Sequence, residues 1–375
     1  MLQGIQLMLM IGPGLPVPAP KAVIDAVQSV QVTSGKDKSG FQITLAISKN
    51  SVLLRTLLPA GYFDPMLTRV VIAVMLGGMP QVLMDGMVTR QELSPGSEPG
   101  QSRLTITGED LSVLMDVVEM PFMRWPATPV IGRVYAILGK YLPLGIVPLA
   151  VPPFINDVPN PISLVPAQKG TDLRYLKRLA SDCGYVFYVE PGPLPGQSIA
   201  YWGPDIRIPV PQRALSVNMD AHTNVESLSF SLDGLAKKVV VVTIFDPVKN
   251  RVPIVVPIPN FNLFKPPLGL RPTLPSKVEF PDYMGKEQLP SVINRVLGIL
   301  ARSSDAISVS GSLDVMRYGA VLRNRMLVGV RGGGLAYDGL YYVNSVTHNI
   351  KRGEFKQSFQ LSRDGLISNT PRLPV

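Results

Sequence analysis

The chain has 375 residues, 46% of them hydrophobic, which allows two or three domains with sizeable cores and argues against disorder. Its 36 basic and 27 acidic residues give a net charge of +9, which allows an acidic partner but does not specify a fold. The single cysteine, Cys183, excludes an internal disulfide and favours assembly in a reducing cytoplasm.

The N-terminal third predicts strands and no membrane span. The start of the chain lacks a basic segment and runs into several prolines, so it does not have the pattern of an export signal. Two longer apolar stretches, 70–84 and 141–154, are interrupted by glycine and proline residues. Because the amides of a membrane helix need partners within the helix, neither stretch is expected to cross a bilayer.

A strand pattern occurs twice in the chain. The segment "VVIAVMLGGMPQVLMDGMVTRQEL" with "SRLTITGEDL" is similar to "RMLVGVRGGGLAYDGLYYVNSVTHNI" with "QSFQLSRDGL", which puts Arg90 opposite His348, 258 positions later. An earlier pair, "AVQSVQVTSGKDKSGFQITLAI" and "NVESLSFSLDGLAKKVVVVTIF", puts Ser29 opposite Ser227, 198 positions later. The difference of 60 between the offsets predicts an insertion in the second copy, which we place at about 246–303.

The segment between the two copies has helical spacing. Residues 111–118 predict a short amphipathic helix, and so do residues 292–300 in the second insertion. In "KGTDLRYLKRLASDCGYVFYVEPG", Thr171 or Asp172 can cap a helix that ends at Gly184 and leads into a strand. The apolar face of that helix contains Leu173, Leu176, Leu179, Ala180 and Cys183.

These elements predict a mainly β protein with an α+β insertion. Two related domains of antiparallel strands would span residues 1–110 and 216–367, with a different, partly helical domain inserted at 111–215. A Pro-rich, partly helical insertion would occupy about 246–303, and residues 368–375 would form a tail.

The candidate reactive residues favour packing over catalysis. His348 lies on the apolar face of a predicted hairpin, no partner acid or base is visible nearby, and its counterpart in the first copy is Arg90. Cys183 is predicted to be buried near a helix C-terminus, where the dipole does not stabilise a thiolate. Two histidines and one cysteine provide no metal cluster, and "RGGGLAYDG" lacks the Lys-Ser/Thr ending of a phosphate loop. We therefore expect no catalytic residue, no metal and no cofactor.

Two surface features have alternative interpretations. The densest basic group is predicted to lie on a solvated or interface-facing sheet surface rather than at a nucleic-acid site; it comprises Arg317, Arg323, Arg325 and Arg331. The Pro-rich stretch 141–166 either forms a partner interface or packs on its own domain. Its candidate interface residues are Leu144, Ile146, Val147, Leu149 and Phe154.

Three stretches together resemble the tail hub proteins of contractile phages: "GLYYVNSVTHNIKRGEFKQSFQLSRDG", "GTDLRYLKRLASDCGYVFYVEPG" and "NVESLSFSLDG". That family includes the late control D proteins and the N-terminal part of the VgrG spike proteins of type VI secretion. The resemblance covers residues 1–367 and implies two related β-barrels with an inserted α/β domain. It also implies a homotrimer around an axial channel, in which six similar units join a six-fold tail tube to a three-fold spike.

The same resemblance implies a non-enzymatic protein in the baseplate of a virion or injection particle, assembled in the bacterial cytoplasm. VgrG-type chains continue into further spike domains, so here the spike is expected to be a separate chain. Other implied partners are the distal tail tube protein and baseplate wedge proteins, with DNA or cargo only in transit. The excess basic groups are then expected outside the channel, because a basic channel wall would retain DNA.

Two other functions remain open at this point. One is a cell-wall or polysaccharide-binding tail module, in which Tyr337, Tyr341 and Tyr342 would stack on sugars. The other is a hydrolase whose carboxylates are dispersed along the sequence.

Overall fold

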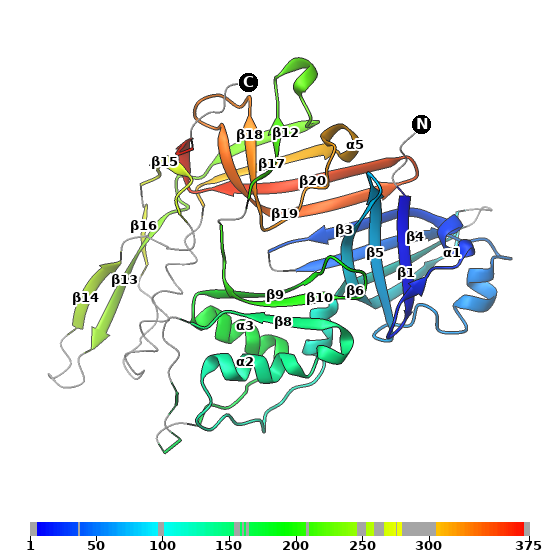
Figure 1. Cartoon of the computed structure of the whole chain (residues 1–375), viewed down its shortest axis with the longest axis horizontal. Helices are drawn as coiled ribbons and strands as arrows, with labels where there is room; N and C mark the ends of the chain where they lie inside the picture. Colours follow the sequence, from blue (N-terminus) through cyan, green and yellow to red (C-terminus); the bar gives the residue numbers. More distant parts are fainter. Residues whose placement is uncertain are drawn as a thin grey trace.

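The computed structural model describes residues 6–36, 38–96, 101–153, 158–159, 161–162, 165–207, 210–245, 253–258, 266–274, 276–279 and 305–370. The protein is mainly β, with large antiparallel sheets and few helices, which confirms the predicted fold class (Figure 1). The predicted helix at 292–300 lies outside the described residues.

A 13-stranded sheet contains strands from both ends of the chain, in the order β12-β17-β20-β19-β3-β4-β7-β6-β5-β1-β2, with β18 and β11 attached beside β19. The N-terminal strands are β1 (Gln6–Pro13), β2 (Val17–Pro18), β3 (Val27–Ser34), β4 (Ser39–Ala46), β5 (Thr68–Leu76), β6 (Met79–Ser94) and β7 (Arg103–Asp110). The C-terminal strands are β11 (Gln212–Ser216), β12 (Ser227–Leu232), β17 (Ile307–Asp314), β18 (Leu327–Arg331), β19 (Gly339–Lys351) and β20 (Glu354–Arg363). Short helical segments connect them: α1 (Lys21–Ala26), η1 (Leu53–Leu57), η4 (Asp220–His222) and α5 (Val315–Tyr318).

The two halves of this sheet repeat one strand order. In the first half the neighbours run β3-β4-β7-β6-β5-β1, and in the second half they run β12-β17-β20-β19-β18-β11. Each strand therefore has a counterpart at the same place in chain order, including the matched pairs β6/β19 and β7/β20. One difference is the last pairing, which is antiparallel between β1 and β5 but parallel between β11 and β18.

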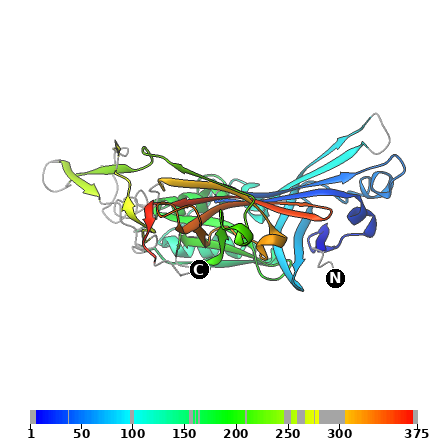
Figure 2. The same ribbon diagram turned by 90° about the horizontal axis from the view of Figure 1, so that it is seen from above.

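The predicted position of the second insertion is wrong at its N-terminal end. The sequence match paired β4 with "KVVVVTIF", which is β13 (Lys238–Phe245), whereas the counterpart of β4 in the sheet is β17. β13 instead pairs with β14 (Pro253–Ile258) and β16 (Lys277–Glu279) in a separate sheet that projects from the large one (Figure 2). The insertion thus follows β12 directly. Alternation of apolar residues identifies a strand but not its partner, which explains the error.

The halves are joined into one body by strands that lie far apart in the sequence. β19 pairs with β3 from Val346 opposite Ser34 to Lys351 opposite Ser29. The buried side chains of both halves form one core, which includes Val30 and Ile43 from the first half and Phe359 from the second. Within the described residues, neither half is therefore an independent unit.

The inserted α/β domain has its own core. α2 (Val130–Gly139) and α3 (Asp172–Asp182) cover one face of a sheet with the order β8-β10-β9 (Figure 1). These strands are β8 (Ile146–Ala150), β10 (Ser198–Pro204) and β9 (Tyr185–Pro191). Two 3-10 segments, η2 (Leu111–Asp116) and η3 (Leu142–Leu144), complete the domain. A fourth small sheet pairs β15 (Gly269–Pro272) with β21 (Gly365–Ser368).

Local signals in this domain account for its central helix. The Thr171 hydroxyl accepts a hydrogen bond from the Arg174 amide at 3.3 Å, and Gly184 follows the helix with φ of 70°. The helix predicted at 111–118 is the 3-10 segment η2, which is shorter than expected and ends at Asp116. The predicted boundary at 215 falls inside β11, which belongs to the large sheet, so that boundary is wrong.

Candidate functional site

The candidate site is the junction at which the inserted domain meets both halves of the large sheet. One buried ion pair fixes the inserted domain to the first half. Arg69 on β5 donates from Nε to Asp85 Oδ1 at 2.7 Å and from Nη2 to Asp85 Oδ2 at 2.6 Å. Arg69 also donates to the carbonyls of Leu144 at 2.8 Å and Gly196 at 3.0 Å, and the Ser198 hydroxyl donates to Asp85. The junction therefore has a fully bonded charged centre.

A second buried ion pair fixes the exit from the inserted domain to the second half. Arg207 donates to both carboxylate oxygens of Asp305 at 2.9 and 2.7 Å. Its guanidinium also lies 5.0 Å from the ring centroid of Tyr342, and the Tyr342 hydroxyl donates to Asp205 at 2.8 Å. The Ser362 hydroxyl donates to Asp305 as well. Both ends of β10 are thus held by buried polar contacts.

Arg325 touches all three parts of the molecule. Its amide donates to the Val343 carbonyl of the second half at 2.8 Å, and its Nη2 donates to the carbonyls of Gly35 and Lys36 in the first half. Its guanidinium carbon lies 3.7 Å from the ring centroid of Tyr188 in the inserted domain. Arg325 has φ of 59°, a left-handed conformation that non-glycine residues adopt at a cost.

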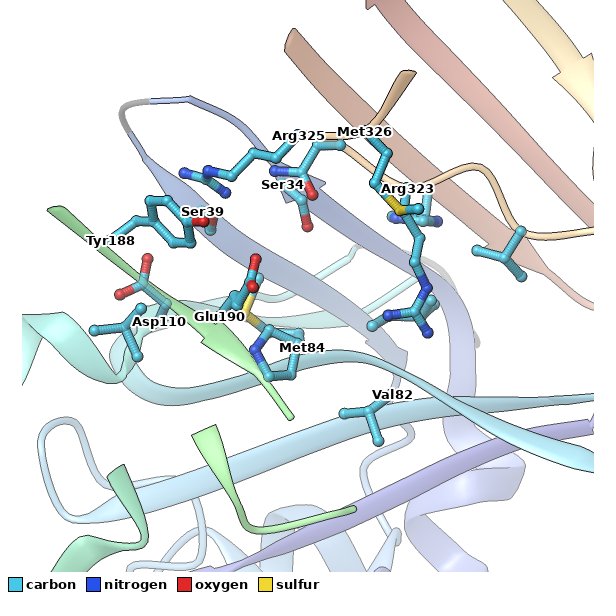
Figure 3. Close-up of a pocket in the computed structure, with 16 residues that line it drawn as sticks. Ser34, Ser39, Val82, Met84, Asp110, Tyr188, Glu190, Arg323, Arg325 and Met326 are labelled. Carbon is cyan, nitrogen blue, oxygen red and sulfur yellow. The ribbon is translucent and has the colours of Figure 1, made fainter. Parts of the chain in front are cut away.

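A cavity of about 220 Å³ lies between these parts (Figure 3). Glu190 and Met84 lie near its centre, with Arg325 and Tyr188 on one side and Arg323 on the other (Figure 3). Burial raises the pKa of the Glu190 carboxyl, and the charges of Arg325 and Arg323 oppose this rise. Burial also raises the pKa of Asp110, whose carboxylate accepts the Ser112 amide. The cavity is lined by mixed charges with no nucleophile and base in contact, so the arrangement is suited to holding the parts together.

His348 lines the same cavity, and its hydrogen bond defines its tautomer. Gln357 accepts the Leu322 amide with Oε1 and donates to the Leu322 carbonyl with Nε2. The same Nε2 lies 3.0 Å from His348 Nδ1, so Nδ1 accepts and the ring proton is on Nε2. Burial lowers the pKa of His348 to about 3, and it is neutral at ordinary pH. These contacts are those of a hydrogen-bonded packing residue.

The five predicted interface residues have different environments. Ile146 is fully buried in the core of the inserted domain, so its side chain is unavailable to a partner. Val147 and Leu149 point away from that core and are 48% and 52% exposed. Leu144 is 36% exposed and its carbonyl accepts from Arg69. Phe154 lies outside the described residues. Val147 and Leu149 on β8, with the less exposed Leu144, are what remains of the predicted surface.

Other predicted residues are placed as follows. Tyr341 and Tyr342 are buried, with exposures of 0% and 2%, so they cannot stack on a sugar as the polysaccharide alternative required. Cys183 is partly buried, and burial raises the pKa of its thiol to about 12. Arg317 and Arg323 are exposed, whereas Arg325 belongs to the junction.

The two ion pairs were not predicted from the sequence. Arg69 and Asp85 each stand within an apolar run, "TRVVIAVML" and "QVLMDGMV", where a charged residue needs a buried partner. That mismatch is the signal that could have identified them, although it does not say which charge pairs with which. Among the described residues, no group of three or more His, Cys, Asp or Glu side chains could hold a metal ion. None of the described helices combines the length and apolar character needed to cross a membrane.

No protein-family model matches the chain, and no curated protein matches it in sequence. Solved structures do match its fold. A tail protein from Neisseria meningitidis MC58 has a TM-score of 0.65 at 14% identity, over 97% of this chain and 98% of that one. The 43 kDa tail protein of prophage MuSo2 from Shewanella oneidensis has a TM-score of 0.60 at 12% identity, over 97% and 100%.

A third match comes from a Francisella PdpA–VgrG complex, with a TM-score of 0.57 at 8% identity, over 100% of this chain and 60% of that one. At these identities the shared feature is the fold. The chain therefore has the fold of phage tail and VgrG-type proteins, which confirms the resemblance found in the sequence.

Proposed function

We propose that this protein is a structural component of a phage tail baseplate or a related contractile injection particle, in which it acts as a trimeric hub. The observation that carries this proposal is the repeated strand order in the two halves of one sheet. Three copies of such a chain present six similar units, so one ring can face a six-fold tube and a three-fold spike. The fold shared with tail proteins from two bacterial sources supports the same assignment.

The expected partners follow from this role. They are two further copies of the chain, a spike protein, the distal tail tube protein and baseplate wedge proteins, with DNA or cargo only in transit through the channel. The particle would be assembled in the bacterial cytoplasm. A non-enzymatic role agrees with a junction whose charged groups bond to each other and to backbone carbonyls.

The mass of the purified full-length chain tests the proposal. We expect mass photometry to give three times the 40.7 kDa of one chain, and electron microscopy to show a ring with a central channel. Class averages should have three-fold symmetry with six similar lobes. A chain that stays monomeric and binds neither a tube nor a spike protein on co-expression would contradict the hub role.

A further inference from the structure

Three exposed arginines surround one turn of the second half. They are Arg213 on β11, Arg317 in α5, and Arg323 in the segment between α5 and β18. Hydrogen bonds of their neighbours hold these elements together. The side chain of Gln212 accepts from the Arg323 amide and donates to the Arg323 carbonyl, both at 2.8 Å. The Tyr318 hydroxyl donates to the Arg213 carbonyl. We call these three residues the arginine surface.

The arginine surface is positioned by neutral groups. Arg323 donates from Nη2 to Gln81 Oε1 at 2.6 Å. Arg213 packs against Gly319, which has φ of 75° and where an added Cβ would lie 2.6 Å from Arg213 Nη1. Glycine is thus needed at this position both for the backbone and for the space that the guanidinium occupies. These contacts restrain the side chains of Arg213 and Arg323 without placing a carboxylate in ion-pair contact with either guanidinium.

Within the described part of the chain, none of the three guanidinium groups forms an ion pair. The carboxylate of Asp314 accepts the amides of Met316 and Arg317 at the start of α5, which fixes it at the helix terminus. Arg323 lies near Glu190 at the junction cavity, and its charge acts to lower the pKa of that carboxyl, although the two side chains do not form an ion pair. The guanidinium groups of Arg213 and Arg317 are therefore exposed without a charged partner among the described residues, and that of Arg323 has only the nearby carboxyl of Glu190.

We propose that the arginine surface binds an acidic segment of a partner protein. A guanidinium matches a carboxylate with two parallel hydrogen bonds, and arginines already restrained lose less entropy on binding. The chemistry favours a protein over a nucleic acid. Tyr318, the aromatic residue at this surface, is fully buried and cannot stack on a base, and α5 has only four residues, too few to enter a groove.

A binding experiment with the full-length chain tests this proposal independently of the hub role. The probe is a fluorescein-labelled hexaglutamate peptide, measured by fluorescence anisotropy at low and at physiological salt. We expect R213Q/R317Q/R323Q to weaken binding at least about tenfold, because three charge-assisted contacts are lost. The matched control K21Q/K49Q/R103Q removes three exposed charges from the first half and should change binding by less than about twofold.

Charge reversal provides a second variant. R213E/R317E/R323E should no longer bind hexaglutamate and should instead bind a hexalysine peptide. Thermal unfolding shows that the variant is folded. Equal weakening by the two glutamine variants would mean that net charge alone binds the probe, and would overturn the proposal. An absence of hexaglutamate binding would also overturn the proposal. The same holds if a labelled 20-bp DNA duplex binds the wild type more tightly than the peptide does and if R213Q/R317Q/R323Q loses that DNA binding.

Discussion

Single residues join the parts of this molecule. Arg69 and Asp85 are 4% and 1% exposed, and each would be an isolated buried charge without the other. Breaking such a pair costs about 3–5 kcal/mol, because the remaining charge stays in a low-dielectric environment. Arg325 acts differently, since it uses backbone carbonyls and an aromatic ring instead of a carboxylate. The three-part junction thus depends on a few cations with specific partners.

His348 gives a prediction on pH. Burial lowers its pKa to about 3, from 6.5 in the unfolded chain, so the unfolded state binds the proton more readily. The stability that the neutral His348 contributes is complete above pH 6.5 and is lost as the pH falls towards 3. When the pH is lowered from 7 to 5, the free energy of unfolding of the wild type should fall by about 2 kcal/mol more than that of His348→Leu. Urea unfolding at the two pH values measures this difference.

His222 provides the control for that experiment, because it is exposed on η4. His222→Leu should keep the wild-type dependence on pH. The carboxyls of Glu190 and Asp110, whose pKa values are raised by burial, act in the opposite direction, so the comparison with His348→Leu is the informative one. Identical slopes for the wild type and His348→Leu would show that burial does not perturb this histidine.

β8 is a strand with an exposed apolar face. It pairs with β10 alone among the described strands, and its alternate residues separate a buried side from an exposed one. Pro148 in the middle of β8 removes one amide donor, which is typical of an edge strand. The strand therefore combines a stable inner face with side chains that a partner can cover.

We expect V147S/L149S to impair assembly while leaving the subunit folded. Exposed positions tolerate such changes within about 0.5 kcal/mol, whereas a lost apolar contact in an interface weakens association. Ile146→Ser is the contrast, because that residue is fully buried and its loss should cost about 2–4 kcal/mol of stability. Thermal unfolding and mass photometry report the two effects separately. Unchanged assembly of V147S/L149S would remove the interface interpretation.

Elements that form from residues close together in the sequence were predictable. The hairpin of β19 and β20, with its turn at Arg352 and Gly353, follows from alternation and a glycine with φ of 77°. The cap at Thr171 is equally local. The pairing of β3 with β19 and the ion pair of Arg207 with Asp305 were not predictable, because they join residues far apart in sequence through geometry that alternation does not encode. Arg69 and Asp85 are only 16 positions apart, and a charge within each apolar run was the available signal. The cavity at the junction depends on those same contacts.

The molecule has two hydrophobic cores, and polar contacts couple them. The large sheet has one core shared by both halves, and the inserted domain has a separate core. Both tryptophans, Trp125 and Trp202, pack in the inserted domain, so tryptophan fluorescence reports on that domain alone. Far-UV circular dichroism reports on the helices and strands of both parts, so a fluorescence transition that precedes the dichroism transition indicates that the inserted domain unfolds first.

Asp85→Asn should separate these signals in urea. Detachment of the inserted domain allows water to reach the unpaired guanidinium of Arg69, so the fluorescence transition should move to lower urea than the dichroism transition. We expect the free energy of unfolding of the inserted domain to fall by about 3 kcal/mol. Arg90→Gln, which breaks the exposed pair with Glu92, should leave both transitions unchanged. Coincident transitions in Asp85→Asn would show that other contacts couple the cores.

The ladder between β3 and β19 also has a consequence during synthesis. Thr33 and Thr347, neighbours across that ladder, are 314 positions apart. At 5–20 residues per second, the ribosome needs roughly 15 to 60 s between them. Throughout that delay the nascent chain carries β3 with one row of unbonded amides, a template for pairing with other chains. Translation that stops before His348 would therefore release a polypeptide prone to aggregate, since only the last hairpin to be made can cover that row.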